Sequence, residues 1–502
     1  MRNYHKGTPV VRRLKASDRS ECLDTRGRRM KDAWIRSARY VLMVLLGSAL
    51  LISPRPAGAQ PYEVPSTWGG DLQTRPRLTG NWGGLRDELG KKGVVLDMDV
   101  LLTPQSVLTG GKDTGAQFWG KANYTLNVDT GKLGLWPGGF IKISGCTSFG
   151  NHVLGGSGAI VPVNLAALVP TPKETDSALE GATFTQFLST KFGLFAGKIA
   201  TLDLAHGEFT GNYRTQFMNT GLAMPVALAM VPLSAFGGGI IVLPAKNVML
   251  TAMVMDPNGT PTSNDLGKAF DHGVTTLSAG SLTIKPFGLV GHQSVTGVYS
   301  NKDRPSLIQD PSNLARLLMT EKFPRLGNSG PMLLQIIEQV YPNLLKPVKP
   351  LNRENTSWAI IYGFDQYLWQ TSSDPKRGIG VFFNFGTSDG RANPIKYSYS
   401  MGIGGNGVVP GRPNDTFGIG YARTEFSDNF LRFLRDNLHL GLDHEDAIEI
   451  YYNASITEWL NVSPSLQVVN SALKKKLDSS GNLKDMDTAV VAGLRVYIRF
   501  WP

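Results

Sequence analysis

The chain has 502 residues, of which 41% are hydrophobic and 18% charged, with 57 glycines and 30 prolines. This apolar fraction excludes an intrinsically disordered chain, and the glycines lack the one-in-three period of collagen. The formal net charge of +11 would suit a nucleic-acid-binding protein. However, residues 1–59 hold 13 Lys or Arg and 4 Asp or Glu, which leaves 38 basic and 36 acidic residues in the rest. The basic charge therefore belongs to the leader, and no nucleic-acid partner is predicted.

The leader has the order of a secretory signal peptide. Lys31, Arg36 and Arg39 precede an apolar run at residues 40–52, and the small residues 57–59 follow as a cleavage site. A short membrane anchor is the alternative, but the run is too short to span a bilayer comfortably. We expect residues 1–59 to be an N-terminal extension and a cleaved signal peptide, with translation starting at Met30 and the mature protein at Gln60.

The rest of the chain repeats segments of about ten residues in which apolar and polar side chains alternate. Alternation also fits a soluble β-sandwich, but aromatic residues near the segment ends and the even number of segments favour an outer-membrane barrel. We predict an all-β fold, a transmembrane antiparallel β-barrel of about sixteen strands. The predicted strands are 94–102, 117–128, 139–149, 182–190, 192–199, 237–243, 247–255, 275–285, 290–299, 357–369, 378–388, 395–405, 416–424, 446–456, 459–470 and 488–500.

The predicted connections are mostly long after odd strands and short after even ones, as in a barrel with long extracellular loops and short periplasmic turns. The long ones are 103–116, 150–181, 200–236, 256–274, 300–356, 425–445 and 471–487. Residues 60–93 would form an N-terminal periplasmic segment, and residues 94–502 the barrel. Within 300–356, the spacing of Met332, Leu333, Ile336, Ile337 and Val340 after Pro331 predicts a helix.

Motifs for catalysis or metal binding are weak. Gly402, Gly404 and Gly407 fit G-x-G-x-x-G, but prolines follow where a dinucleotide fingerprint needs a helix. The histidines after the leader have no metal-ligand spacing, and no nucleophile elbow occurs. We expect no cofactor, no metal and no enzymatic activity. A carboxylate pair for glycoside hydrolysis is the alternative that the composition leaves open.

Several segments, strongest after residue 357, resemble the OprB-type carbohydrate-selective porins of Gram-negative outer membranes. The similar stretches are 78–86, 364–368, 374–378, 388–390, 393–395, 402–405, 410–418, 449–453, 459–460, 466–468 and 493–495. The resemblance implies a sixteen-stranded barrel in the outer membrane that passes glucose-like sugars by facilitated diffusion. It also implies contact with membrane lipid and the barrel assembly machinery, and a homo-oligomer, such as a trimer, is possible.

Three functions remain open at this stage: a sugar-selective porin, a general or other-solute porin, and a glycan- or lipid-acting outer-membrane enzyme. The third lacks a catalytic constellation and ranks last. Sugars offer C–H faces to aromatic rings and hydroxyls to charged side chains. By strand alternation, the pore-lining candidates are Trp119, Lys121, Glu449, Arg495 and Arg499, with Asp97, Asp99, Asp365 and Tyr451 on the same inward faces. Solvated wall residues are the alternative for each.

The third long loop, 200–236, is the candidate constriction, since the resemblance implies that this loop folds into the channel. It carries Asp203, Glu208 and Arg214, with Lys198 at its base, and Trp119 could offer a stacking surface. We predict hydroxyl binding by these charged groups. The alternative is that they pin the loop to the barrel wall.

Overall fold

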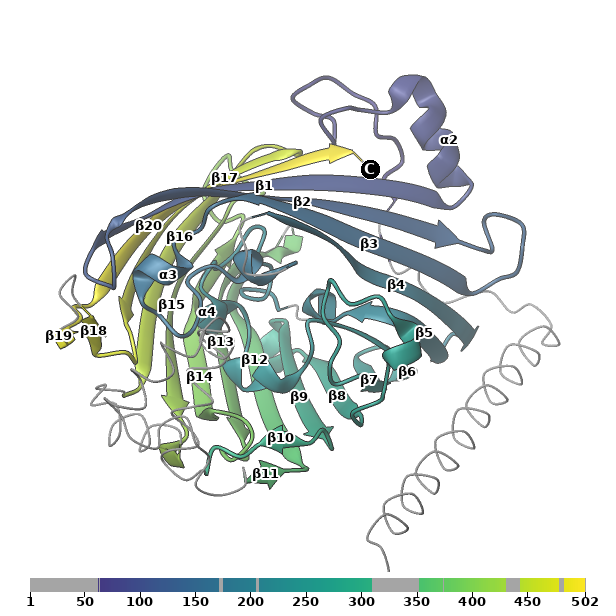
Figure 1. Ribbon diagram of the computed structural model, residues 1–502. Coiled ribbons are helices and arrows are strands. Elements are labelled where there is room, and N and C mark those ends of the chain that lie inside the picture. Colours follow the sequence, from purple (N-terminus) through teal and green to yellow (C-terminus); the bar gives the residue numbers. More distant parts are fainter. Residues whose placement is uncertain are drawn as a thin grey trace, which may run out of the picture. The chain divides into compact units, whose positions relative to one another are not determined.

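Sixteen strands close into one antiparallel barrel in the computed structural model (Figure 1). The structure describes residues 62, 64–170, 175–204, 207–308, 352–372, 374–429, 443–477 and 483–501, all within one compact unit. The predicted signal peptide and the helix predicted after Pro331 lie outside these residues. The barrel strands are β1 (Val94–Thr109), β2 (Gly115–Asp129), β3 (Gly139–Gly150), β4 (Asp176–Ser189), β5 (Phe192–Ala200), β6 (Ser234–Ala245), β7 (Val248–Met255), β8 (Thr275–Ile284), β9 (Gly291–Ser300), β12 (Ser357–Thr371), β13 (Asp374–Ser388), β14 (Ile395–Asn406), β15 (Thr416–Phe426), β16 (Glu445–Thr457), β17 (Leu460–Asn470) and β20 (Ala489–Trp501).

Strand order follows chain order, and the last strand, β20, pairs with the first, β1. Each predicted segment coincides with one strand, so the predicted fold class is confirmed. The predicted long loop 103–116 is wrong, because β1 continues to Thr109 and β2 already begins at Gly115. The inward side chains of β1 keep alternating through Thr103, Gln105 and Val107, which are buried under other parts of the chain.

The outward face of the barrel is apolar. Ile360, Ile419, Ile450 and Leu494 are each at least 40% exposed, although they lie on regular strands. Their neighbours along the strand point inward, as Arg495 does beside Leu494, and are buried. An exposed apolar surface of this kind is unfavourable in water but favourable in contact with membrane lipid.

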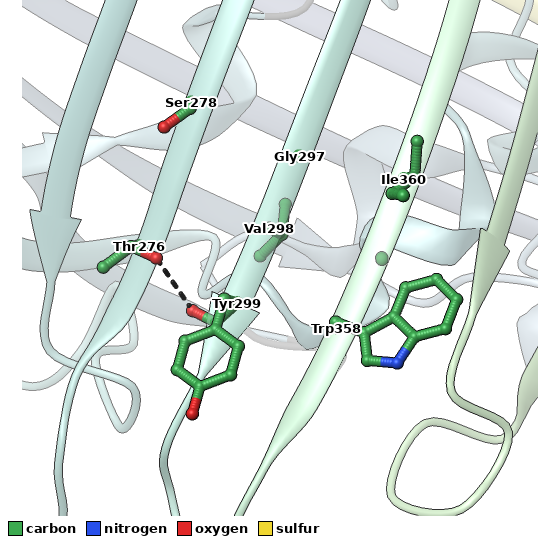
Figure 2. Close-up of a pocket in the computed structure, with 8 residues that line it drawn as sticks. Thr276, Ser278, Gly297, Val298, Tyr299, Trp358 and Ile360 are labelled. Carbon is green, nitrogen blue, oxygen red and sulfur yellow. Dashed lines mark hydrogen bonds between the residues drawn. The ribbon is translucent and has the colours of Figure 1, made fainter.

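A recess interrupts this outer wall where β8, β9 and β12 lie side by side (Figure 2). Gly297 leaves it open, since a Cβ atom there would meet nothing within 4 Å. Trp358, Tyr299 and Ile360 surround it, and all three are more than 40% exposed. The Thr276 hydroxyl donates to the Tyr299 carbonyl oxygen at 3.3 Å. The recess therefore belongs to the apolar outer surface and not to the lumen.

The N-terminal segment, residues 64–93, lies at the end of the barrel where the connections are short. It contains η1 (Trp82–Gly84) and α2 (Leu85–Lys91). Trp68, 3% exposed, packs so closely on Gly90 that a Cβ atom there would come within 2.5 Å of the indole ring. The amides of Leu78 and Thr79 donate to carbonyl oxygens at the end of β20, at 2.9 and 3.1 Å. These bonds fix the segment to the seam between β20 and β1.

The remaining elements are short, and within the described residues no helix has the length and apolarity to cross a membrane. Small helices are found in the connections: α3 (Leu154–Ser157), η2 (Leu165–Leu168), η3 (Thr201–Leu204), α4 (Thr220–Ala223), η4 (Val226–Met230), η5 (Leu266–Lys268) and η6 (Pro286–Gly288). Two ribbons, β10 (Arg304–Pro305) with β11 (Arg353–Glu354) and β18 (Lys475–Leu477) with β19 (Leu483–Asp485), extend from the barrel.

Candidate functional site: the barrel lumen

The connection between β5 and β6, described at residues 201–204 and 207–233, crosses the lumen, and we call it the crossing loop. It contacts strands on the far wall: Phe209 packs on Tyr367 of β12, and Phe217 packs on Tyr451 of β16, with ring centroids 4.9 and 4.8 Å apart. Figure 1 shows α4, which belongs to this loop, inside the ring of strands. The predicted inward fold of the third long loop is confirmed.

Local hydrogen bonds give the crossing loop its shape. The Asn219 side chain caps α4 by accepting from the Gly221 amide at 2.9 Å. The Gln216 side chain accepts from the Asn212 amide and donates to the Glu208 carbonyl oxygen, at 2.9 and 2.8 Å. Such short polar side chains satisfy backbone groups that have no ladder partner in an irregular loop.

Two buried charges anchor the crossing loop to the far wall. The Glu449 carboxylate, fully buried, accepts from the amides of Met218 and Asn219 at 3.0 and 2.8 Å. The Arg495 guanidinium, 2% exposed, donates to the carbonyl oxygens of Tyr213 and Gln216 at 2.9 and 2.7 Å. Both predicted pore-lining residues therefore point inward, but in this structure they contact the loop backbone and not the open lumen.

Residues 151–170, the described part of the connection that follows β3, also lie inside the barrel, and we call this segment the companion loop. Glu445 of β16, 3% exposed, accepts from the amides of Ile160 and Val161, both at 2.8 Å. The Leu165 amide donates to the Met218 carbonyl oxygen at 2.8 Å, which joins the two loops. The sequence analysis placed 150–181 among the long connections but did not predict that it folds inward, although residues 153–172 contain no Asp, Glu, Lys or Arg. An uncharged stretch of this length is unusual for a connection exposed to water.

Glycines on the inner wall leave room for the aromatic side chains of the crossing loop. A Cβ atom on Gly404 of β14 would lie 2.6 Å from Phe209, and one on Gly418 of β15 would lie 2.8 Å from Phe217. Gly404 belongs to the G-x-G-x-x-G stretch, so part of that pattern serves close packing within the barrel.

Loops inside the barrel bury three further predicted site residues. Trp119, 1% exposed, packs against Leu165 and Tyr213. The Lys121 ammonium, fully buried, donates to Glu180 Oε1 at 2.8 Å. Lys198 lies at the base of the crossing loop but holds another loop, because its ammonium donates to the carbonyl oxygens of Pro261 and Ser263, both at 2.8 Å. No solute can reach these side chains while the loops stay in place.

Unlike these buried candidates, Arg214 has a side chain that remains partly exposed. Its guanidinium lies 3.3 Å from Asp99 of β1, and the two side chains are 25% and 17% exposed. The carboxylate also accepts from the Asn123 side chain at 2.6 Å. Arg499 of β20 stands opposite Asp99 in the strand register, with its guanidinium 5.3 Å from the ring of Tyr497.

Glu208 is at a second partly exposed cluster, on the side of β9 and β12. Its amide donates to Asp365 Oδ2 at 3.2 Å, and Asp365 Oδ1 lies 2.6 Å from Nδ1 of His292. Burial, together with the nearby Asp365 carboxylate, raises the pKa of Glu208. The side chain of Asp203 lies outside the described part of the chain. Among the described residues, no group of three or more His, Cys, Asp or Glu side chains could hold a metal ion.

A closed sixteen-stranded antiparallel barrel with an apolar outer wall and loops folded into its lumen defines the porin class of channel. The sequence model of the OprB family, described as carbohydrate-selective porins, matches residues 114–500. The chain belongs to this family. Family and fold imply an outer-membrane protein, and they are those of a non-enzymatic channel.

A curated relative in sequence and a solved structure are also similar to this chain. The chain is 28% identical over 148 residues to Porin B of Pseudomonas aeruginosa, a match that covers 27% of this chain and 31% of Porin B. The match therefore spans less than a third of that curated relative. The high-pH structure of Pseudomonas putida OprB covers 86% of this chain and 100% of its own, at a TM-score of 0.68 and 19% identity. At that identity, the likeness supports the fold.

Proposed function

We propose that this porin lets glucose-like sugars cross the outer membrane into the periplasm by facilitated diffusion. The observation that carries the proposal is the set of charged groups that remain partly exposed beside the crossing loop: Arg214 with Asp99, and Glu208 with His292. Asp365, which pairs with His292, is itself buried. Membership of the carbohydrate-selective family supports it.

Paired charges suit a neutral polyol better than an ion. A guanidinium beside a carboxylate offers hydrogen-bond donors and acceptors with little net charge, so sugar hydroxyls can exchange their water for protein contacts. A ring of one charge sign would instead favour the opposite ion. Because release must be fast, several modest contacts serve transport better than one tight pocket.

The buried candidates have a different role in this proposal. Trp119, Lys121, Lys198, Glu449 and Arg495 shape the lumen by holding the loops and do not bind the solute. Glu208, Arg214 and Arg499 remain the solute-binding candidates, and Asp203 is retained as a candidate from its position in the crossing loop.

The wider setting is also part of the proposal. The chain would be exported through a signal peptide cleaved before Gln60, inserted by the barrel assembly machinery, and surrounded by outer-membrane lipid, with a homotrimer as its assembled form. It would need no cofactor and catalyse no reaction.

Liposome swelling tests the proposal. Arg214→Ala and Glu208→Ala should each lower the preference for glucose over a non-sugar solute of similar size about two- to fivefold, the value of one hydrogen bond of about 0.5–1 kcal/mol. Single-channel conductance should change only modestly. Arg391→Ala, at an exposed site in the connection after β13, is the control for loss of one arginine. If conductance rises strongly and all solutes gain equally, these residues hold the loop and do not recognise sugar.

A further inference from the structure

The inner face of β1 carries two carboxylates, each bound by an arginine from outside the barrel strands. Asp97 and Asp99 are two residues apart, so they stand about 6.6 Å apart along the strand. Asp99 is bound by Arg214 of the crossing loop. Asp97 is bound by Arg77 of the N-terminal segment, whose Nε and Nη2 atoms each donate to one carboxylate oxygen at 3.0 Å.

The N-terminal segment is held in the position that this pair requires. The Leu78 amide, adjacent to Arg77, donates to the Arg499 carbonyl oxygen at 2.9 Å. The Trp459 indole N–H donates to the Leu72 carbonyl oxygen at 2.7 Å. Arg77 is therefore fixed beside Asp97 before any solute arrives, which lowers the entropy cost of binding.

The Arg77–Asp97 pair differs in solvent exposure from Glu449 and Arg495, which anchor the crossing loop. The side chains of Arg77 and Asp97 are 21% and 37% exposed, whereas Glu449 and Arg495 are 0% and 2% exposed. Arg499 is also partly exposed, and no ion pair to it is found among the described residues. Two arginines and one carboxylate thus keep hydrogen-bonding capacity toward water at the periplasmic mouth.

We propose that Arg77, Asp97 and Arg499 form a second carbohydrate subsite, at the periplasmic mouth of the lumen. The planar guanidinium of Arg499 donates to two vicinal hydroxyl oxygens of a neutral pyranose, and Asp97 accepts from a hydroxyl. Arg499 stands opposite Asp99 in the strand register, so the subsite adjoins the Arg214–Asp99 pair, and a sugar passes directly from one weak site to the other. The subsite rests on the proposed function, because it requires that sugars use the lumen.

Sugar block of single channels, with full-length protein inserted in one orientation, tests the subsite. Glucose is added on one side at a time, and the association rate is measured from each side. Arg499→Gln and Arg77→Gln should lower the association rate from the periplasmic side about fivefold, and change the rate from the extracellular side less than about twofold. Lys92→Gln, at an exposed site at the end of α2, is the control for charge.

The outcomes separate the subsite from the proposed function. If the unmodified protein shows no block by glucose from either side, sugar passage and subsite both fail. If it shows block, and Arg499→Gln leaves both association rates unchanged or lowers them equally, the subsite alone is wrong. A changed conductance in salt without sugar would assign Arg77 and Arg499 to barrel structure, which also overturns the subsite.

Discussion

Two groups of charged residues inside the barrel differ in what they bind. On the wall that carries the loops, Glu445, Glu449 and Arg495 are at most 3% exposed, and they bind backbone amides and carbonyl oxygens. Near the N-terminal segment, Asp97 and Asp99 are 37% and 17% exposed, and arginine side chains bind them. An inward charge in a porin therefore serves structure when backbone groups use its hydrogen bonds, and can serve solutes when water still reaches it.

The largest effect should come from removing a buried anchor. Glu449→Ala leaves the amides of Met218 and Asn219 without their acceptor in a buried place, which costs about 2–4 kcal/mol of loop attachment. The crossing loop should leave the wall, so single-channel conductance should rise strongly and all solutes should gain. Arg495→Leu should act in the same direction.

Glu458→Ala removes the same side chain at an exposed site in the turn between β16 and β17, and should change nothing. If Glu449→Ala instead lowers only the preference for glucose at constant conductance, Glu449 binds solute. The distinction between buried anchors of the loop and partly exposed solute-binding charges is then wrong.

A smaller effect is expected where the crossing loop packs on glycine. Gly404→Ala places a methyl group within 2.6 Å of Phe209, and such overpacking costs about 1–3 kcal/mol. The displaced loop should reduce the preference for glucose in liposome swelling. The closed barrel, in which backbone groups bond between strands, should resist SDS in the variant as in the unmodified protein. Gly297→Ala, on the open outer wall, is the matched control and should leave both readouts unchanged. Equal behaviour of the two variants would show that Phe209 does not hold the loop.

The smallest effect concerns pH. The raised pKa of Glu208 keeps this side chain neutral above the usual range for glutamate, near Asp365, His292, Tyr367 and Lys376. As the pH rises from about 4 to about 7, ionisation of Glu208 adds a negative charge to the lumen, so the permeability ratio of K⁺ to Cl⁻ should rise. Reversal potentials in a salt gradient measure this ratio. Glu208→Gln should flatten the rise, and an unchanged slope would mean that another group titrates.

The strands could be predicted from the sequence because alternation is a local property. In β20, Leu494 and Arg495 already separate the outer from the inner face, and the structure keeps that assignment. The end of β1 was misplaced because its outward face loses apolar character at Pro104 and Ser106, and because Thr103 and Gln105 on the inner face gave no sign of burial. They are buried at 3% and 4% only through the loops that cover them.

The sequence predicted which face of its strand each candidate side chain lies on, but not whether that side chain is exposed in the lumen. Alternation places Trp119 and Lys121 on the inner face, yet it gives no information on what covers them. The covering residues, such as Leu165 and Tyr213, come from loops without periodicity, and their partners are strands remote in sequence. Arg77 was missed for the same reason, since its partner Asp97 lies across a turn of the chain that no local pattern describes.

The pairing of β1 with β20 has a consequence for how the chain becomes a barrel. Every other neighbouring pair in the barrel is joined by the chain between two consecutive strands, but this pair unites the first and the last. Until β20 arrives, β1 presents a free edge that could pair with another chain. The barrel therefore cannot close until nearly the whole polypeptide is present, and we expect the β1–β20 pairing, which has the highest sequence separation, to form last. The two ends of the barrel sequence also become spatial neighbours, so a circular permutant opened at the two-residue turn between β4 and β5 would turn this late pairing into a local hairpin.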